Sequence, residues 1–475
     1  TAVPTDEPVI IIVPTEEPTV EPTVEATVEA TTEPVLTSEG EIETSAVPGA
    51  FSSEYIVAMN LNGSAATNVT LDLYTNSATP VQTLSKNAFA GGGVTFPLAQ
   101  FNNDGQYSGV VSSSDPIVAG VYNTNFTGKL SDMYLGTSNP AQNVNLPLVY
   151  RNHFSNASTF YIQNAHSVAQ NITVRAYLIG TTSPKVTKTY NSVPPNTTLT
   201  VNFASDSAYS AFGSGNGAYG YALITGSAGP IAAVSQTIRD IGSDRFMTSY
   251  NGLNPSTDAG TSLVAPLVYN QHFDWITGIT VVNTENKNTT VTMNYVSNKG
   301  NGSKSISLAP NAVGLFYLPD INPKASYGSA TLTSNNAKII AMVNNARAAQ
   351  GFGSATAALN SSAATSKIAI PIILNSNSGN AWRSGITVYT FGATTVTGTF
   401  VKVDANPATS GNKIVKNISL GANSVGLFYG PDFLPASNYT GVLYLQASGS
   451  TKIMALANVS NLVGGFSGQM PGVNY

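Results

Sequence analysis

Few residue types in this sequence can carry out acid–base, nucleophilic or metal chemistry. The chain contains three histidines, His153, His166 and His272, and no cysteine. Without a thiol it can form neither a disulfide nor an iron–sulfur cluster. His153 and His272 occupy the same position in two copies of a repeated motif, and a metal site needs several converging ligands. We therefore predict that these two histidines pack at a domain junction, and that the chain binds no metal ion and no other cofactor.

The acidic residues outside the N-terminal segment are equally scattered. Asp320 and Asp432 each follow a proline at equivalent positions, where Asp commonly hydrogen-bonds the backbone of its own turn. The only glutamates after residue 50 are Glu54 and Glu285, which are too far apart in sequence to suggest a glycosidase pair. No Gly-x-Ser-x-Gly, phosphate-loop or His-Glu-x-x-His motif is present. The sequence predicts no catalytic residue, and hence a protein that is not an enzyme.

Composition narrows the class of protein. The chain has 475 residues and a net charge of −5, and 9% of its residues are charged, against about 25% in an average soluble protein. Its hydrophobic content of 42% is enough for buried cores, but no stretch approaches the ~20 apolar residues of a membrane helix. The chain begins with Thr and has no basic-then-apolar leader, so we expect a mature form without its targeting segment. We predict an extracellular protein, secreted or on the cell surface.

Charge is distributed unevenly along the chain. The first 50 residues hold 11 of the 25 acidic residues and no Lys or Arg, which leaves 14 acidic and 20 basic residues in the remainder. This asymmetry indicates an acidic arm that can lie on a mildly basic body. The basic residues form no cluster, so we expect no nucleic-acid partner.

Residues 1–47 form a Pro-, Thr- and Glu-rich segment with a two-residue alternation. In residues 17–33, Glu and Thr occupy the odd positions, while Pro, Val and Ala occupy the even positions except at Thr32. In an extended chain this pattern places the carboxylates on one face and the apolar side chains on the other. Every proline of the segment has an even number, so in this register one strand edge keeps its N–H groups free to pair.

Residues 9–13 are apolar on both faces of such a strand. A strand of this kind is stable when both faces are buried, and exposed it is an aggregation hazard. We therefore predict that the segment adds as a strand to a neighbouring subunit. A spacer to the cell surface is the alternative explanation of the same composition. The predicted subunit-interface residues are Val9, Ile10, Ile11, Ile12, Val13, Val20, Val24 and Val28.

Repeated motifs divide the remainder into four units. Residues 146–154 recur as 265–273 and, more loosely, as 370–375, and residues 311–320 match 423–432. Short Val-, Thr- and Tyr-rich runs between Asn and Gly predict about seven strands per unit, as in an immunoglobulin-like sandwich. We predict an all-β protein of tandem immunoglobulin-like β-sandwich domains with an extended N-terminal arm. The predicted divisions are the arm, 1–47, and sandwiches at 48–144, 145–262, 263–366 and 367–475.

The repeated Pro-Leu-Val at 147–149 and 266–268, the Gly-Ile-Thr-Val at 278–281 and 385–388, and the Phe-Tyr pairs at 316–317 and 428–429 carry a family resemblance. The pattern resembles the tandem β-sandwich repeats of secreted surface proteins from Chloroflexota-type bacteria. The resemblance covers residues 145–475 well and 48–144 weakly. It implies an extracellular, non-enzymatic architecture and brings no catalytic residues.

The sequence also permits N-glycosylation, because Asn-x-Ser/Thr triplets are frequent. In a chain this rich in Asn, Ser and Thr, roughly ten such triplets arise by chance, so their presence does not argue for modification. The candidate asparagines are Asn62, Asn68, Asn125, Asn156, Asn171, Asn196, Asn288, Asn301, Asn360, Asn417, Asn438 and Asn458.

These observations predict the structural subunit of an extracellular filament or sheath, a homopolymer joined by N-terminal strand addition. The alternative is a cell-surface adhesin or carbohydrate-binding module that holds surface glycans with its loops and uses the tail as a spacer. Trp275 and Trp382 are the only tryptophans that can offer a sugar platform, and their equivalent repeat positions favour packing in a core or at a junction.

Overall fold

The computed structural model describes residues 40–45, 53–101, 107–125, 130–241, 244–347, 351–376, 382–435, 438–461 and 466–475. Its regular secondary structure is almost entirely β-strand, with a few short 3-10 helices and turns between the strands. The all-β prediction is therefore confirmed, and so is the tandem sandwich architecture. No helix among these residues is long and apolar enough to cross a bilayer.

The first sandwich contains two four-stranded sheets, ordered β1-β6-β3-β4 and β5-β2-β7-β8. Its elements are β1 (Gly40–Ser45), β2 (Ser53–Asn60), β3 (Thr67–Tyr74), β4 (Gln82–Ala88), β5 (Gly93–Pro97), η1 (Leu98–Gln100), β6 (Ser108–Ser113), β7 (Ile117–Asn125) and β8 (Leu130–Leu135).

The second sandwich has the order β12-β11-β14-β9 in one layer, and β10, β15 and β16 in the other, where β13 pairs with β10. The elements are β9 (Asn143–His153), β10 (Asn156–Asn164), β11 (Gln170–Leu178), β12 (Val186–Val193), β13 (Thr198–Val201), η2 (Ser207–Phe212), β14 (Tyr219–Gly226), β15 (Ile231–Ile241) and β16 (Asp244–Asn251).

The third sandwich repeats this order as β20-β19-β22-β17 and β18-β23-β24, with β21 on β18 and β25 on β17. The elements are β17 (Ser262–His272), β18 (Trp275–Asn283), β19 (Thr289–Ser297), β20 (Gly300–Leu308), β21 (Val313–Tyr317), η3 (Leu318–Asp320), β22 (Ser326–Ser334), β23 (Ile339–Arg347), β24 (Phe352–Ala357), β25 (Leu359–Asn360) and η5 (Ser361–Ala363).

The fourth sandwich has the sheets β29-β28-β31-β26-β34 and β30-β27-β32-β33. The elements are β26 (Lys367–Asn375), β27 (Trp382–Thr390), β28 (Thr394–Lys402), β29 (Lys413–Leu420), β30 (Ser424–Tyr429), η6 (Gly430–Asp432), β31 (Tyr439–Ala447), β32 (Ile453–Asn461), β33 (Phe466–Pro471) and β34 (Val473–Asn474).

One strand order thus recurs four times. The fourth, third, sixth and first strands of a unit form one layer, and the fifth, second, seventh and eighth form the other. Strand β3 illustrates the reason, because Val69, Leu71 and Leu73 are buried while Thr70 and Asp72 are half-exposed. This two-residue alternation gives each sheet one apolar face, and the two apolar faces of a unit pack together as its core.

Strand β1 lies inside the segment that the sequence predicts to be an arm. It pairs antiparallel with β6, from Gly40 opposite Ser113 to Ser45 opposite Ser108. In the shared strand order, β1 has the place that β9, β17 and β26 have in the later units. The first sandwich therefore begins no later than Gly40. The rest of the predicted arm lies outside the described residues.

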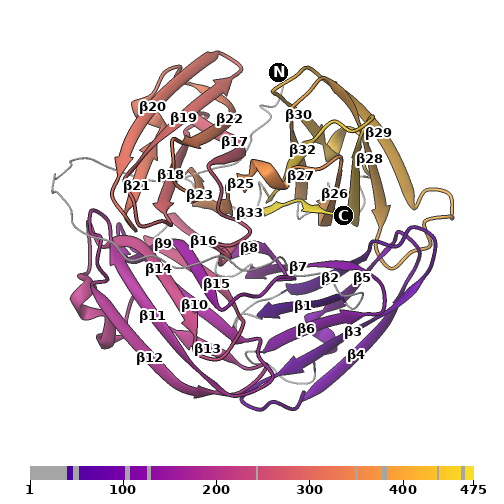
Figure 1. Ribbon diagram of the computed structural model, residues 1–475. Coiled ribbons are helices and arrows are strands. Elements are labelled where there is room, and N and C mark those ends of the chain that lie inside the picture. Colours follow the sequence, from indigo (N-terminus) through magenta and orange to yellow (C-terminus); the bar gives the residue numbers. More distant parts are fainter. Residues whose placement is uncertain are drawn as a thin grey trace.

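The four sandwiches close into a ring (Figure 1). The eighth strand of each unit, β8, β16, β24 or β33, lies at the centre, and we call these four the hub strands. The Ser131 hydroxyl of β8 donates to the Ser467 carbonyl of β33 at 3.2 Å, and the Ser467 hydroxyl donates to the Gly353 carbonyl of β24 at 2.9 Å. Gly353 packs on Phe246 of β16, and Ser249 of β16 donates to a carboxylate of β8. Each hub strand therefore touches the next, and the fourth unit meets the first.

The junction between the fourth and first sandwiches is largely apolar. Buried side chains from β2, β7 and β8 pack with side chains from β26, β31 and β33 in one continuous cluster, which includes Val57, Met59, Met133, Val442 and Met470. Burying such a surface between segments more than 200 residues apart in the sequence stabilises the closed ring over an open chain of sandwiches.

Candidate functional site at the ring axis

The hub strands are buried on both faces, yet they carry many polar side chains. Ser131, Asp132, Ser249, Ser354 and Gln469 are each at most 4% exposed. Burial of a polar group is unfavourable unless it finds a hydrogen-bond partner. The stability of the hub therefore depends on whether these polar side chains find hydrogen-bond partners.

Asp132 is the one ionisable residue of this set. Its Oδ1 accepts a hydrogen bond from Asn123 Nδ2 at 2.9 Å, and its Oδ2 accepts from Gln236 Nε2 at 3.3 Å and from the Ser249 hydroxyl. Burial raises the pKa of Asp132 to about 6, although the three hydrogen bonds oppose the shift by stabilising the carboxylate. Because Gln236 and Ser249 belong to the second sandwich, this carboxyl group joins two units at the ring axis.

Several buried polar atoms around the hub have no hydrogen-bond partner within the described part of the chain. Such atoms are uncommon in folded proteins, and water or a ligand often completes them. The hub atoms concerned are Asn123 Oδ1, Asn345 Oδ1, Ser354 Oγ, Thr356 Oγ1, Asn458 Oδ1 and Gln469 Nε2.

A cavity of about 350 Å³ opens over one end of the hub. All four sandwiches line it, mainly through the ends of the hub strands and the segments that follow them, which we call the crossing segments. In three units the crossing segment bridges to the first strand of its own unit: Leu253 pairs with Asn145, β25 with β17, and β34 with β26. In the first unit Ala141 bridges instead to Ile231 of the second sandwich. The repeated crossover therefore builds a site that no single sandwich contains.

The second sandwich supplies a compact polar group to this cavity. Asp258 Oδ2 accepts a hydrogen bond from the Asn254 amide at 2.8 Å, and its Oδ1 accepts from Thr257 Oγ1 at 3.0 Å. Burial raises the pKa of Asp258. Asn360 of the third sandwich donates through Nδ2 to the carbonyl of Thr257 at 3.2 Å, which ties the neighbouring crossing segment to this turn.

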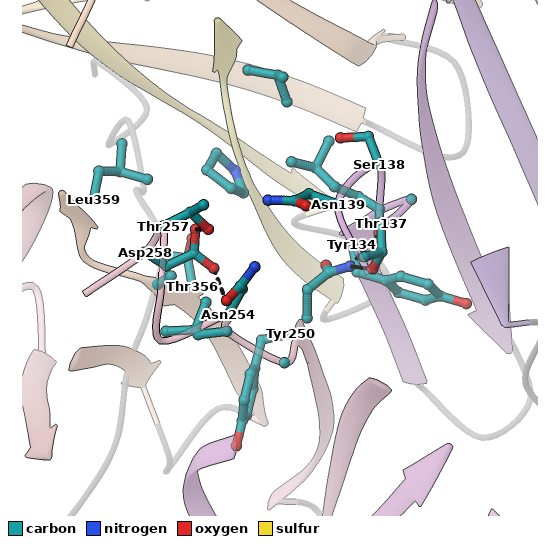
Figure 2. Close-up of a pocket in the computed structure, with 18 of the residues that line it drawn as sticks. Tyr134, Thr137, Ser138, Asn139, Tyr250, Asn254, Thr257, Asp258, Thr356 and Leu359 are labelled. Carbon is teal, nitrogen blue, oxygen red and sulfur yellow. Dashed lines mark hydrogen bonds between the residues drawn. The ribbon is translucent and has the colours of Figure 1, made fainter. Parts of the chain in front are cut away.

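Figure 2 shows how these groups lie. Thr257, Asp258 and Asn254 lie on one side of the cavity, and Asn139 of the first sandwich extends toward them from the other side. The ring of Tyr250 points away from the cavity, and its hydroxyl is engaged with the backbone of Leu148. The cavity thus offers amide, hydroxyl and carboxyl groups from opposite walls.

The chemistry available in this cavity is hydrogen bonding. The lining contains Ser, Thr, Asn and Gln side chains, the Asp258 carboxyl and apolar residues, and no Lys, Arg or His among the described residues. No group of three or more His, Asp or Glu that is suited to a metal ion is found in the described part of the chain. The arrangement favours a neutral ligand over an anion, because no cationic group would balance a negative charge.

Sequence reasoning missed both Asp132 and Asp258. One signal was present: Asp132 is the only charged residue in β8, whose sequence is otherwise uncharged and apolar-rich. Its partners Gln236 and Ser249 are more than 100 positions away, so no local pattern connects them with it.

The predicted subunit-interface residues, Val9 to Val13 together with Val20, Val24 and Val28, lie outside the described residues. The strand-donation interface therefore stays a prediction.

The candidate glycosylation sites differ in their access to solvent. Asn156 and Asn458 are 2% and 6% exposed, and Asn156 Nδ2 donates to the His153 carbonyl at 2.9 Å. Asn62, Asn196 and Asn360 are partly buried, and the Asn62 amide donates to Asp115 at 2.8 Å. The side chain of Asn125 lies outside the described residues. The exposed candidates are Asn68, Asn171, Asn288, Asn301, Asn417 and Asn438.

The two equivalent histidines lie in equivalent aromatic clusters, and their ring partners come from their own sandwich, not from the neighbouring unit that the junction prediction implies. His153 stacks on Tyr150 and Tyr219, with ring centroids 5.9 and 4.5 Å away, and His272 packs against Tyr327 at 4.7 Å. The Gly217 amide donates to His153 Nδ1 at 2.8 Å. Burial lowers the pKa of His153 to about 4, so this ring stays neutral at physiological pH.

The two tryptophans lie at junctions between units. Trp275 is 2% exposed and packs with Phe246 of the second sandwich and Leu456 of the fourth. The Trp382 ring meets that of Tyr122 in the first sandwich edge-to-face, with centroids 5.2 Å apart. Trp275 thus presents no sugar platform on the surface.

Asp320, for which the sequence predicts a bond to its own turn, instead makes an ion pair with Lys304 at 2.9 Å. Asp432 is exposed in the short helix η6. Neither lies among the residues that line the axial cavity.

Comparison with known proteins assigns no family. No protein-family model and no curated protein matches the sequence. A solved glycoside hydrolase of family 32 from Bifidobacterium adolescentis aligns with 7% identity over 87% of this chain and 99% of its own, with a TM-score of 0.14. The tetra-tandem repeat from the extending region of a large adhesion protein aligns with 10% identity over 92% of this chain and 99% of its own, with a TM-score of 0.10. These TM-scores are too low to indicate a shared fold, and we take no function from either structure.

Proposed function

We propose that this protein is an extracellular structural subunit, and that it polymerises when its N-terminal segment adds as a strand to the outer edge of a neighbouring ring. In this proposal the protein acts through assembly and not as an enzyme. Its low charge content and its abundance of Thr, Asn and Tyr support a location outside the cell. The observation that carries the proposal is the charge of the outer sheet edges.

The fourth strand of each unit, β4, β12, β20 or β29, ends a sheet on the outside of the ring. None of these strands contains Asp or Glu. Each of these four strands contains a lysine: Lys86 in β4, Lys188 in β12, Lys304 in β20 and Lys416 in β29. Lys188 Nζ lies over an aromatic ring, 5.6 Å from the centroid of Tyr190, and Lys416 Nζ lies 5.8 Å from that of Phe433. The other two lysines make ion pairs, Lys86 with Asp404 and Lys304 with Asp320.

A lysine on an open edge strand discourages pairing with an uncharged strand, because pairing would remove the ammonium group from water. This penalty is largest for Lys188 and Lys416, which make no ion pair among the described residues, and smaller for Lys86 and Lys304, which already pair with Asp404 and Asp320. A strand that carries glutamates removes that penalty. Residues 17–33 present Glu at every fourth position, and the first 50 residues contain no base. The lysine edges therefore favour the acidic segment over another copy's edge strand.

The same charges explain why the sheet edges of two rings would not simply join. Lys against Lys across a new strand pair is repulsive, and like charges directly opposite each other destabilise a sheet. Assembly is then directed to a single type of contact, with the acidic segment of one copy on a lysine edge of the next.

The proposal is tested by negative-stain microscopy and light scattering of the full chain beside a variant that lacks residues 1–39. This deletion keeps β1, which the first sandwich needs as its opening strand. We expect polymers from the full chain and single rings from the deletion variant. A matched charge control replaces Glu17, Glu21, Glu25, Glu29 and Glu33 by Gln and keeps the length and the alternation.

Single rings from both the full chain and the deletion variant would overturn the proposal. Polymers from both would place the subunit contact outside the segment. If the Glu-to-Gln control polymerises as well as the full chain at low ionic strength, the charge argument is wrong even though the segment is needed.

A further inference from the structure

We infer that the axial cavity is a binding site for a neutral, hydroxyl-rich ligand of monosaccharide size. This inference goes beyond the proposed function and does not depend on it, because the cavity is built within one ring. It rests on the size of the cavity, on the polar groups that face one another across it (Figure 2), and on the absence of cationic side chains from its described lining.

The size and shape suit a small molecule. A volume of about 350 Å³ lies at the lower end of the ~300–1,000 Å³ that is typical of small-molecule sites. The wall combines apolar side chains, such as Leu253, Ile368 and Val473, with polar ones from all four units. A sugar ring has the same mixed character, with apolar C–H faces and a rim of hydroxyl groups.

Two atoms in the wall lack partners and are deeply buried. Thr356 Oγ1 and Gln469 Nε2 have no hydrogen-bond partner among the described residues, and the two side chains are 3% and 2% exposed. The other end of the Gln469 amide is already fixed, because its Oε1 accepts from Asn345 Nδ2 at 2.8 Å. Both side chains line the cavity, but the two atoms lie just beneath its surface with less than 1 Å² of accessible area each. A ligand hydroxyl, which can both donate and accept, reaches them when the neighbouring side chains shift.

The turn that contains Asp258 adds an acceptor on the second-sandwich wall. Its carboxyl oxygens are held by the Asn254 amide and the Thr257 hydroxyl, and each oxygen keeps a further lone pair for a ligand donor. Asn139 faces this turn across the cavity (Figure 2). Donors and acceptors thus approach a ligand from several directions, as recognition of a polyol requires.

The charges of the lining residues limit the class of ligand that the cavity can bind. No Lys, Arg or His is found among the described lining residues, so a uronic acid or a sugar phosphate would enter without a counter-ion. Asp258 would also repel such an anion when it is ionised. The site therefore selects neutral sugars over anionic ones.

The test is isothermal titration calorimetry, with saturation-transfer NMR, of the full chain with D-glucose, D-galactose, D-mannose, N-acetylglucosamine and D-glucuronate. We expect at least one neutral sugar to bind and glucuronate to fail. Ala363 is exposed and lines the cavity, so Ala363→Trp is expected to block its mouth and abolish binding, while Ala363→Ser retains it. Thr356→Val keeps the side-chain shape and removes the unpaired hydroxyl, and is expected to weaken binding about tenfold.

A matched control is Thr387→Val, the same change in a separate cavity of about 270 Å³ between the third and fourth sandwiches, which is expected to leave binding unchanged. Failure of every neutral sugar to bind at millimolar concentration would overturn the inference. Binding that survives both Ala363→Trp and Thr356→Val would also overturn it, because the sugar would then occupy another site. Polymerisation is measured separately, so either proposal can fail without the other.

Discussion

Asp404 of the fourth sandwich accepts a hydrogen bond from the backbone amide of Thr95 in the first sandwich at 3.2 Å. The Thr95 hydroxyl donates to the same carboxylate, and Lys86 Nζ lies 3.6 Å from its Oδ1. One side chain thereby joins positions 309 residues apart, at the junction where the ring closes.

Asp404 also has a backbone φ of +52°, a conformation that Asn and Asp tolerate better than Ala. Asp404→Ala is therefore expected to lower the free energy of unfolding by about 2 kcal/mol, through lost hydrogen bonds and backbone strain. Asp404→Asn should cost about 1 kcal/mol, because it keeps one acceptor and the backbone preference. Urea denaturation of the two variants measures the difference, and a double-mutant cycle with Thr95→Val should show non-additive coupling. Full additivity would mean that this contact does not contribute to closure.

Asp132 predicts a pH dependence of stability. Its pKa is about 6 in the fold, against an ordinary value of 3.8, so the folded state binds the proton more tightly than the unfolded chain does. The contribution of this group to stability is therefore greatest below pH 4, falls as the pH rises from about 4 to about 6, and stays low above that range. The difference is about 3 kcal/mol for one fully buried carboxyl group.

Asp132→Asn removes this titration and is expected to flatten the stability profile between pH 4 and 6. Above pH 6 the variant avoids a buried charge but loses one of the two acceptor oxygens that Asn123, Gln236 and Ser249 donate to, so the slope of the profile and not its height is the test. Urea denaturation at pH 4, 5, 6 and 7 measures both curves. Parallel curves would show that Asp132 does not titrate in this range. Acidification has the opposite effect at His153: because its pKa is lowered in the fold, protonating it reduces stability. His153 is present in both the natural chain and the variant, so its effect is the same in the two curves.

The hub strands β24 and β16 approach each other closely at Gly353, so any side chain added at this position is expected to clash with Phe246. A Cβ atom at this position would lie 2.2 Å from Cδ2 of the buried Phe246 ring. Gly353→Ala is expected to destabilise the ring by about 1–3 kcal/mol, as overpacking does in other cores. Gly63→Ala is the matched control, because a Cβ there has no atom within 4 Å. Equal midpoints of thermal unfolding for the two variants would contradict the tight packing of β24 on β16.

Burial also predicts which asparagines a glycosylating host can modify after folding. Asn68, Asn171, Asn288, Asn301, Asn417 and Asn438 are exposed, whereas Asn156 and Asn458 are buried. Peptide mapping by mass spectrometry of protein secreted from such a host is expected to find glycans only outside the buried pair. Occupancy at Asn458, which lies beside the hub, would be incompatible with the closed ring.

Local patterns in the sequence are enough to predict the all-β fold class. The alternation of Val69, Leu71 and Leu73 with polar residues predicts strand β3 directly, because side chains on a strand alternate between its two faces. The repeated Asn311–Asp320 and Asn423–Asp432 segments correspond to the β21–η3 and β30–η6 elements in the third and fourth sandwiches. These features depend on residues close together in the chain, and short-range patterns record them.

The ring of units and its axial cavity arise from contacts that form only between complete, folded sandwiches. In the sequence nothing distinguishes Asp404 from other loop residues, because its partner Thr95 is 309 positions away. Asp132 lies in an apolar-rich strand, and its partners Gln236 and Ser249 reach it only when the first and second sandwiches meet at the hub. The cavity wall combines crossing segments from all four units. No periodic pattern encodes such contacts, because they depend on how complete sandwiches pack against one another.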